Sequence, residues 1–198
     1  MKSGLLISVI FALAQMASAQ TLQLTGTEDI GKLIEIYSQA SGQKFVLDPG
    51  VRGRVTILNK EPISFDEAFH QISLGLAIHG YAVVKNGDVM VVRPARAAQR
   101  DLVEISTELP ALKPERLATW IVTLRHGTAD SVMREFRNVT TKDGDISSVE
   151  RTNQILITDY TSNLHRFAQI IKTVDRPTDP SLEKHVAKSR KEREGRQK

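Results

Sequence analysis

Apolar residues between positions 20 and 94 repeat with two different periods, which predicts helices alternating with strands. One helix face shows the i, i+3, i+4, i+7 spacing, and it consists of Ile30, Leu33, Ile34 and Tyr37. Thr27 is placed to cap this helix, with Glu28 and Asp29 in its first turn, where acidic groups suit the positive end of the helix dipole. Gly42 is placed to end it.

A second helix is predicted to open at Ser64, three residues before Glu67, which is the spacing of a capping box. Gly80 is placed to close it, and Asn86-Gly87 is the strongest hairpin signal in the chain. Short apolar runs around these helices predict strands at 21–24, 44–47, 54–58, 81–84 and 89–92. The expected order of this module is β-α-β-β-α-β-β.

A second set of periodic segments predicts a smaller module of the order β-α-β-β-α. A strand at 120–124 precedes a helix capped by Thr128, and strands at 146–149 and 154–158 precede a last helix. We therefore expect an α+β fold of two small mixed-sheet domains. The predicted organisation is a signal peptide at 1–19, a first domain at 20–94, a linker at 95–116 with one short strand near 103–105, a second domain at 117–176 and a basic tail at 177–198.

The start of the chain has the pattern of a secretory signal peptide. Lys2 precedes an apolar run at 5–14 that is too short to span a bilayer, and Ala17-Ser18-Ala19 forms a small-residue cleavage site. The chain contains no cysteine, which excludes disulfides, thiolate metal ligands and cysteine nucleophiles. We expect an exported protein of the bacterial periplasm, held together by core packing alone.

The net charge of +4 is concentrated at the C-terminus. Residues 182–198 hold seven Lys or Arg against three Glu, whereas residues 20–181 hold 19 basic against 20 acidic residues. A nearly neutral body argues against nucleic acid as a partner. The tail is interpreted as a solvated end or, alternatively, as an electrostatic attachment to anionic lipid, the cell wall or an acidic partner.

No catalytic motif is found in the sequence. The five histidines lack metal-ligand spacing, phosphate-loop and GxSxG motifs are absent, and Asp143-Gly144-Asp145 lacks the remaining ligands of a calcium loop. His126 is interpreted as an exposed loop residue rather than as a ligand or base. We expect no enzyme activity, no metal and no cofactor.

The remaining candidates for function are strand edges, which can accept a strand from a partner. Two segments are proposed as partner-binding: Leu22, Gln23 and Leu24, and Arg52, Arg54, Val55, Thr56 and Ile57. The alternative is that both segments are internal strands, fully paired within their own sheet.

Four runs resemble the N-terminal domains of bacterial secretins. Residues 45–56, F-V-L-D-P-G-V-R-G-R-V-T, resemble the signature F-V-x-D-P-x-V-x-G-x-V-T of the first domain, called N0. Residues 79–84 (H-G-Y-A-V-V) and 91–95 (V-V-R-P-A) are similar to its ending. The second domain is similar to the KH-like N1 domain through T-N-Q-I-L-I-T-D at 152–159 and its continuation to Asp175.

The resemblance implies a periplasmic ring. The first domain would dock an inner-membrane component of a type II secretion or type IV pilus machine, and the second would stack with secretin-like subunits or with copies of itself. Known secretins continue into further repeats and an outer-membrane gate. This sequence ends at its basic tail, so we expect no gate from it, and a stand-alone accessory, a split secretin and a truncated relic stay open as alternatives.

The leading hypothesis is a non-catalytic interaction module that meets the membrane only peripherally or through its partners. A second hypothesis is a periplasmic enzyme or small-ligand binder that uses the cleft between the modules. A third is an envelope-surface binder that works through the basic tail.

Overall fold

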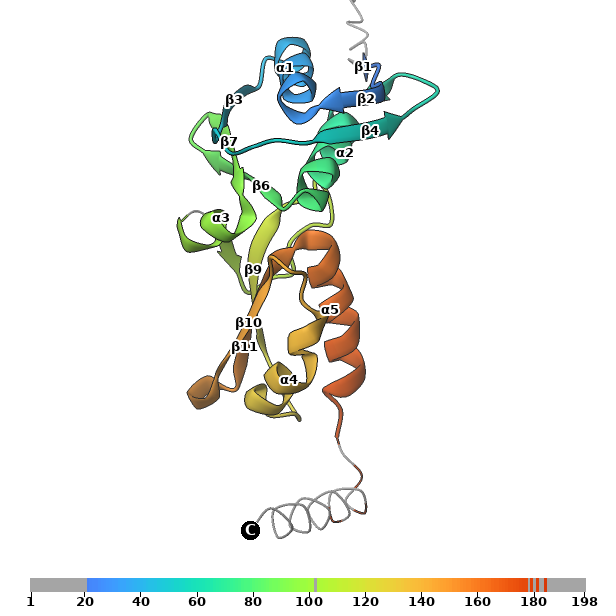
Figure 1. The fold of residues 1–198 in the computed structure, drawn as a ribbon. Coiled ribbons are helices and arrows are strands. Elements are labelled where there is room, and N and C mark those ends of the chain that lie inside the picture. The colour runs from blue at the N-terminus through green and yellow to red at the C-terminus, as the bar shows by residue number, and fades with distance from the viewer. Residues whose placement is uncertain (1–20, 102, 178, 180, 182–183, 185–198) are drawn as a thin grey trace, which may run out of the picture.

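The computed structural model describes residues 21–101, 103–177, 179, 181 and 184. The predicted signal peptide and most of the predicted basic tail lie outside these residues. The described chain forms two modules stacked end to end, with α1 at one end and the last turns of α5 near the other (Figure 1). The prediction of an α+β fold with small mixed sheets is confirmed.

The first module packs two helices against three small sheets. The helices are α1 (Ile30–Ser41) and α2 (Phe65–Ile78). The strands are β1 (Thr21–Leu22), β2 (Thr25–Asp29), β3 (Lys44–Leu47), β4 (Arg54–Leu58), β5 (Ile63–Ser64), β6 (Tyr81–Asn86) and β7 (Val89–Pro94). β2 and β4 form an antiparallel ribbon, β3-β7-β6 form a three-stranded sheet, and β1 pairs with β5. Both helices, the ribbon and the larger sheet contribute to one core.

The predicted start of α1 is wrong. Thr25–Asp29 pairs with β4 as strand β2, so the helix begins only at Ile30. The Thr27 hydroxyl hydrogen-bonds the Thr56 hydroxyl across the ribbon at 2.8 Å instead of capping the helix. The physical reason is the long-range pairing with β4, which a local capping pattern does not contain.

The predicted cap of α2, the predicted end of α1 and the predicted hairpin turn are present in the structure, although the capping box at Ser64 is incomplete. Ser64 Oγ accepts the Glu67 amide at 3.3 Å, while the Glu67 carboxylate pairs with Lys113 rather than completing the capping box. Gly42 ends α1 with φ +74°, and Gly87 turns the β6–β7 hairpin with φ +60°. Both angles lie in the left-handed region that glycine adopts without strain.

The second module places its helices against a four-stranded sheet. Helix α3 (Ala95–Asp101) leads into this module. The elements of the module itself are β8 (Glu104–Ser106), β9 (Leu117–Thr123), α4 (Ala129–Phe136), a 3₁₀ turn (Arg137–Val139), β10 (Asp145–Val149), a second 3₁₀ turn (Glu150–Thr152), β11 (Gln154–Tyr160) and α5 (Thr161–Val174). The strand order is β10-β11-β9-β8, with β8 parallel to β9. Trp120, Ile157 and Phe167 lie in the core between sheet and helices.

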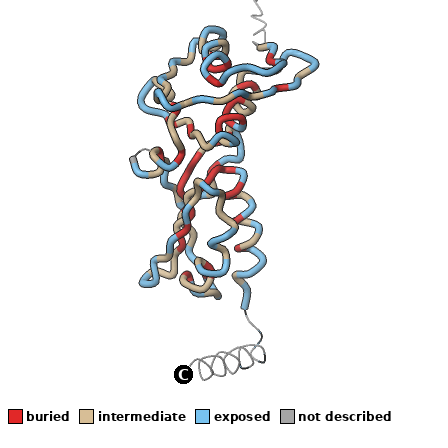
Figure 2. Tube along the Cα trace, in the orientation of Figure 1, coloured by how far each residue is buried: buried red, intermediate tan, exposed pale blue. Residues whose placement is uncertain are grey.

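Helix α3 was not anticipated in the predicted linker, and it joins the two modules. Ala95 and Ala98 are fully buried against Val84 of the first module and against Leu117 and Tyr160 of the second. Buried positions therefore continue from one module across the junction into the other (Figure 2). The short α3 is stabilised by this packing rather than by a periodic pattern of its own.

Polar contacts fix the same junction. The Tyr160 hydroxyl donates to the Tyr81 carbonyl at 3.1 Å. Arg96 and Gln99 of α3 donate to the carbonyl oxygens of Lys142 and Asp143. Burial raises the pKa of Tyr160, so its hydroxyl stays protonated and can serve as this donor at neutral pH.

Candidate partner-binding surface

The structure brings the two predicted partner-binding segments together on the first module. The Asn59 side chain donates to the Leu24 carbonyl at 3.1 Å, and Gln23 donates to the Asn59 carbonyl at 3.3 Å. Leu24 is only 4% exposed and Leu22 packs against the same core. Leu22 and Leu24 therefore serve mainly the core, while Gln23 is exposed and lines one pocket with Val55 and Ile57 of the second segment.

Strand β4 is paired along one edge only within the described chain, because its ribbon has two strands. Val55 and Ile57 point into the module, while Arg54, Thr56 and Leu58 point outward and are exposed. Leu58 is 81% exposed, an unusual setting for a leucine. An unpaired edge next to a partly apolar outer face is suited to strand addition.

The hydroxyl of Tyr81 makes several contacts with the loop that leads into β4. The Arg52 amide donates to Tyr81 Oη at 2.9 Å. The same hydroxyl lies 3.0 Å from the Gly50 carbonyl and 3.1 Å from the Arg52 carbonyl, so its one proton can be donated to either. Tyr81 therefore fixes the loop that carries Arg52.

His79 and Gly53 complete this arrangement. His79 Nε2 lies 3.0 Å from the Arg54 carbonyl, which can only accept, so Nε2 carries the proton. A Cβ atom on Gly53 would lie 2.8 Å from His79 Nδ1, and Gly53 has φ +134°. Gly53 is thus required both for its backbone angle and for the close approach of the imidazole ring.

These contacts link two runs that are separate in the sequence. The loop glycine and arginines belong to the run at 45–56, whereas His79 and Tyr81 belong to the run at 79–84. Sequence reasoning noted both runs but missed their contact. The sequence feature that could have indicated this contact is the His-Gly-Tyr run, which occurs together with a loop rich in glycine and arginine.

This surface carries charges of both signs, because Asp29 and Glu28 of β2 lie across the ribbon from Arg54 and Val55. The side chains of Arg52 and Arg54 are exposed and form no ion pair with any residue that the structure describes. The two guanidinium groups are thus available to acidic groups of a partner that binds beside β4.

In the second module the polar residues of the matched run have structural roles. Asp159 is fully buried and accepts hydrogen bonds from the Thr141 amide at 2.8 Å, the Thr141 hydroxyl at 2.6 Å, the Tyr160 amide at 2.8 Å and Asn163 Nδ2 at 2.7 Å. Asn153, in the left-handed region at φ +51°, bonds both ends of the loop before α4. A buried carboxylate whose oxygens are satisfied in this way stabilises the fold and is not displayed for chemistry.

Asp175 binds the same loop from the end of α5. Its carboxylate accepts the amides of Arg125, His126 and Gly127 at 2.8, 2.7 and 2.9 Å. Burial opposes its ionisation, but the three amide donors outweigh this effect and lower the pKa of Asp175. His126 is exposed and takes part through its backbone.

The described part of the chain shows no group of three His, Asp or Glu side chains arranged to hold a metal ion. Within that part, none of the helices has the length and apolar character needed to cross a bilayer.

Comparison with known proteins identifies the fold. Residues 25–92 match the family described as "GspD-like, N0 domain", and residues 119–179 match the "Bacterial type II/III secretion system short domain". The chain belongs to the secretin family. This confirms the resemblance and relates the chain to type II secretion and protein transport. Secretin N-terminal domains are structural components of secretion machines.

Several secretins align with most of this chain. It is 25% identical to secretin XcpQ of Pseudomonas aeruginosa, covering 74% of this chain and 22% of XcpQ. It is 26% identical to secretin GspD of Vibrio cholerae serotype O1, covering 91% of this chain and 27% of GspD. The chain thus spans about a quarter of the length of these curated secretins.

A solved structure shares the arrangement of both modules. The Klebsiella pneumoniae type II secretion outer-membrane complex, which contains PulD, PulS and the PulC HR domain, matches with a TM-score of 0.67 at 23% identity. The match covers 77% of this chain and 26% of that chain. At this level of identity the comparison establishes a common fold.

Proposed function

We propose that this secretin-family chain is a periplasmic, non-catalytic interaction module that docks an inner-membrane component of a secretion machine through the open edge of β4. The observation that carries the proposal is the strand edge itself, with two unpaired arginines beside it and a loop fixed by Tyr81 and His79. The presence of the PulC HR domain beside PulD in the Klebsiella complex supports a partner of this kind.

Docking at this edge combines two physical effects. An added strand gains main-chain hydrogen bonds along the part of β4 beyond Arg54, whose carbonyl is already bonded to His79, and the arginines favour a partner with matching carboxylates. Because the loop before β4 is already held, little conformational entropy is lost when the partner binds.

The second module is proposed to contact other secretin subunits through the face of its sheet that its own helices leave uncovered. Ile105, which pairs with Thr119, is 67% exposed on this face, and Val149 is 36% exposed. Ile121 and Leu156 pair with each other between them and are half-buried. The upper part of the face, at Leu117 and Tyr160, already packs against the first module, so a further subunit would extend an existing apolar contact.

The β4 proposal is tested by reversing its charges. The double variant Arg52→Glu/Arg54→Glu should bind the purified periplasmic domain of the cognate inner-membrane component about tenfold more weakly, because attraction becomes repulsion at two positions. Lys44→Glu, an exposed cation on β3 in the other sheet, is the matched control and should bind as wild type does. Equal affinity of the double variant and wild type, measured by calorimetry, would contradict docking at this edge.

A further inference from the structure

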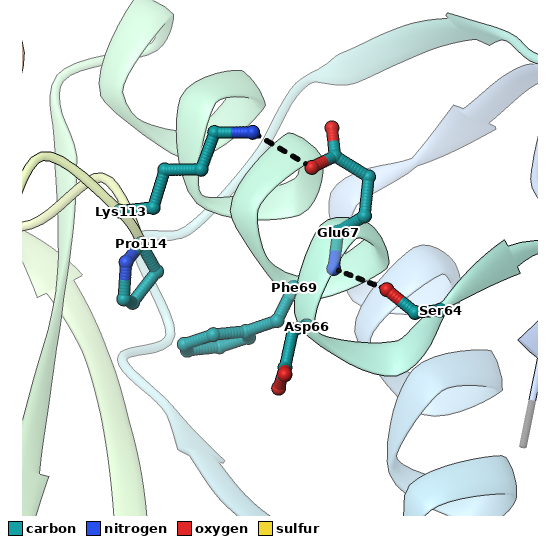
Figure 3. Close-up of a pocket in the computed structure, with 6 residues that line it drawn as sticks. All are labelled: Ser64, Asp66, Glu67, Phe69, Lys113 and Pro114. Atoms are coloured by element: carbon teal, nitrogen blue, oxygen red, sulfur yellow. Dashed lines mark hydrogen bonds and ion pairs between the residues drawn. The ribbon is translucent and has the colours of Figure 1, made fainter. Parts of the chain in front are cut away.

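Two clefts meet at the junction of the modules and share Phe69 and Pro114. The first, of about 480 Å³, lies beside the first turn of α2 and is bordered by Asp66, Glu67 and Lys113 (Figure 3). The second, of about 240 Å³, continues past Phe69 along the ends of β6 and β7. Together they form one groove, called here the junction groove.

The floor of the junction groove is apolar and comes from both modules. Phe69, Val83 and Met90 belong to the first module, and Pro114 precedes β9 of the second. All four are half-buried, so their side chains are partly accessible. Phe69 is stacked on Tyr37 with ring centroids 5.6 Å apart, which fixes the orientation of the ring at the centre of the floor.

The groove is already formed in the free chain. Lys113 pairs with Glu67 of α2 at 2.9 Å, and the Glu115 amide donates to Nδ1 of His70 at 3.2 Å. These two contacts hold the segment that carries Pro114 against α2. A partner would therefore meet a rigid surface and would lose little binding energy to rearrangement.

Most charges along the groove are already engaged: the buried Glu115 carboxylate accepts hydrogen bonds from Thr161 and Ser162, and others form ion pairs. Lys113 is neutralised by Glu67, and Arg116 lies 3.4 Å from Glu104. Asp66 in the first cleft and Lys85 in the second are exposed and form no ion pair with any described residue. The groove thus offers an anion, an apolar floor and a cation in succession.

We propose that the junction groove docks an extended peptide segment of a partner protein in which an apolar side chain lies between a basic and an acidic residue. The apolar side chain covers Phe69 and Pro114, the basic residue meets Asp66, and the acidic residue meets Lys85. This surface is separate from the β4 edge, so the module has room for two partners at once. Its occupancy does not depend on the function proposed for β4.

The test uses residues 20–198 and capped five-residue peptides, titrated while backbone amide resonances are recorded. The first peptide is Lys-Ser-Leu-Ser-Glu, and it should shift the amides of Phe69, Val83 and Met90. Replacing its leucine with serine should abolish these shifts, because the floor then has nothing apolar to bury. Peptides with two lysines or two glutamates at the ends should bind about threefold more weakly, as expected for one lost exposed ion pair.

Charge reversal on the protein makes the assignment specific. Asp66→Lys should change the preference to the peptide with two glutamates, and Lys85→Glu to the peptide with two lysines. Lys85 lies in an exposed part of β6, so this variant keeps the test decisive even if Asp66→Lys disturbs the start of α2. Shifts that avoid the groove, equal binding of the serine peptide, or an unchanged peptide preference in Lys85→Glu would overturn the proposal.

Discussion

Gly53 is the residue on which the geometry before β4 depends, since two requirements meet there. It has φ +134°, and an added Cβ would lie 2.8 Å from His79 Nδ1. Gly53→Ala should therefore lower the free energy of unfolding by about 2 kcal/mol, through backbone strain and displacement of the ring. Urea denaturation followed by circular dichroism measures the change.

The matched control is Gly31→Ala in α1, where an added Cβ meets open space. This substitution should raise stability by about 0.5–1 kcal/mol, because alanine is the better helix former. If Gly53→Ala proved as harmless as Gly31→Ala, the close packing of His79 against the loop would be wrong.

Asp175 links stability to pH at the far end of the molecule. Its pKa is lowered in the folded state, so its contribution is present above the unfolded value of about 3.9 and is lost as the pH falls through the folded pKa. Asp175→Asn should destabilise the protein by about 1 kcal/mol at pH 7, because a neutral oxygen accepts the three amides less strongly. The difference between the thermal melts of the two proteins should shrink as the pH falls through the folded pKa of Asp175, and a difference that does not change with pH would exclude this linkage.

At the scale of elements, the sequence predicted those whose residues face a core with a regular period. The apolar face of α1 and the strands at 44–47 and 54–58 were predicted in this way, and the hairpin followed from Asn86-Gly87. Strand β2 was missed because all five of its residues are exposed, so no alternation marks it and only pairing with β4 defines it. Helix α3 was missed for a related reason, because the packing of Ala95 and Ala98 across the junction stabilises it.

The candidate site was predictable only in part. The segment at 54–57 was recognised as a strand with nearby arginines, and its role in binding stays a prediction. The residues that hold it, Tyr81 and His79, lie about 25 positions away, and a single sequence does not show such contacts. The junction groove could not be predicted for a similar reason, because it needs both Phe69 and Pro114, which lie even farther apart in the sequence.

Helix α2 contains a buried hydroxyl group without a hydrogen-bond partner, which a substitution can remove. The Ser73 hydroxyl is the one described buried side-chain group without a hydrogen-bond partner, and the residue is only 3% exposed. Ser73→Ala should leave stability unchanged or raise it by up to about 1 kcal/mol, because an unsatisfied hydroxyl is costly to bury. Ser38→Ala in α1 is the contrast, since that hydroxyl donates to the Gln43 carbonyl at 2.7 Å and its loss should destabilise the protein. Chemical denaturation measures the free energy of unfolding of both variants. A large loss of stability in Ser73→Ala would show that the Ser73 hydroxyl has a hydrogen-bond partner.

For the whole molecule, we expect the buried junction to make the two modules unfold together. Ala98 is fully buried between Val84 and Leu117, so Ala98→Asp places a charge in an apolar contact that has no partner for it. Trp120, the only tryptophan, reports on the second module, while far-ultraviolet circular dichroism reports on both. The two signals should follow one transition in the native chain and separate in Ala98→Asp, because the modules then lose their coupling.

Arg100→Glu changes the charge of an exposed position on the same helix and should leave the transitions coincident. Separate transitions in the native chain would show that the junction does not couple the modules, and the rigid groove between them would then lose its basis.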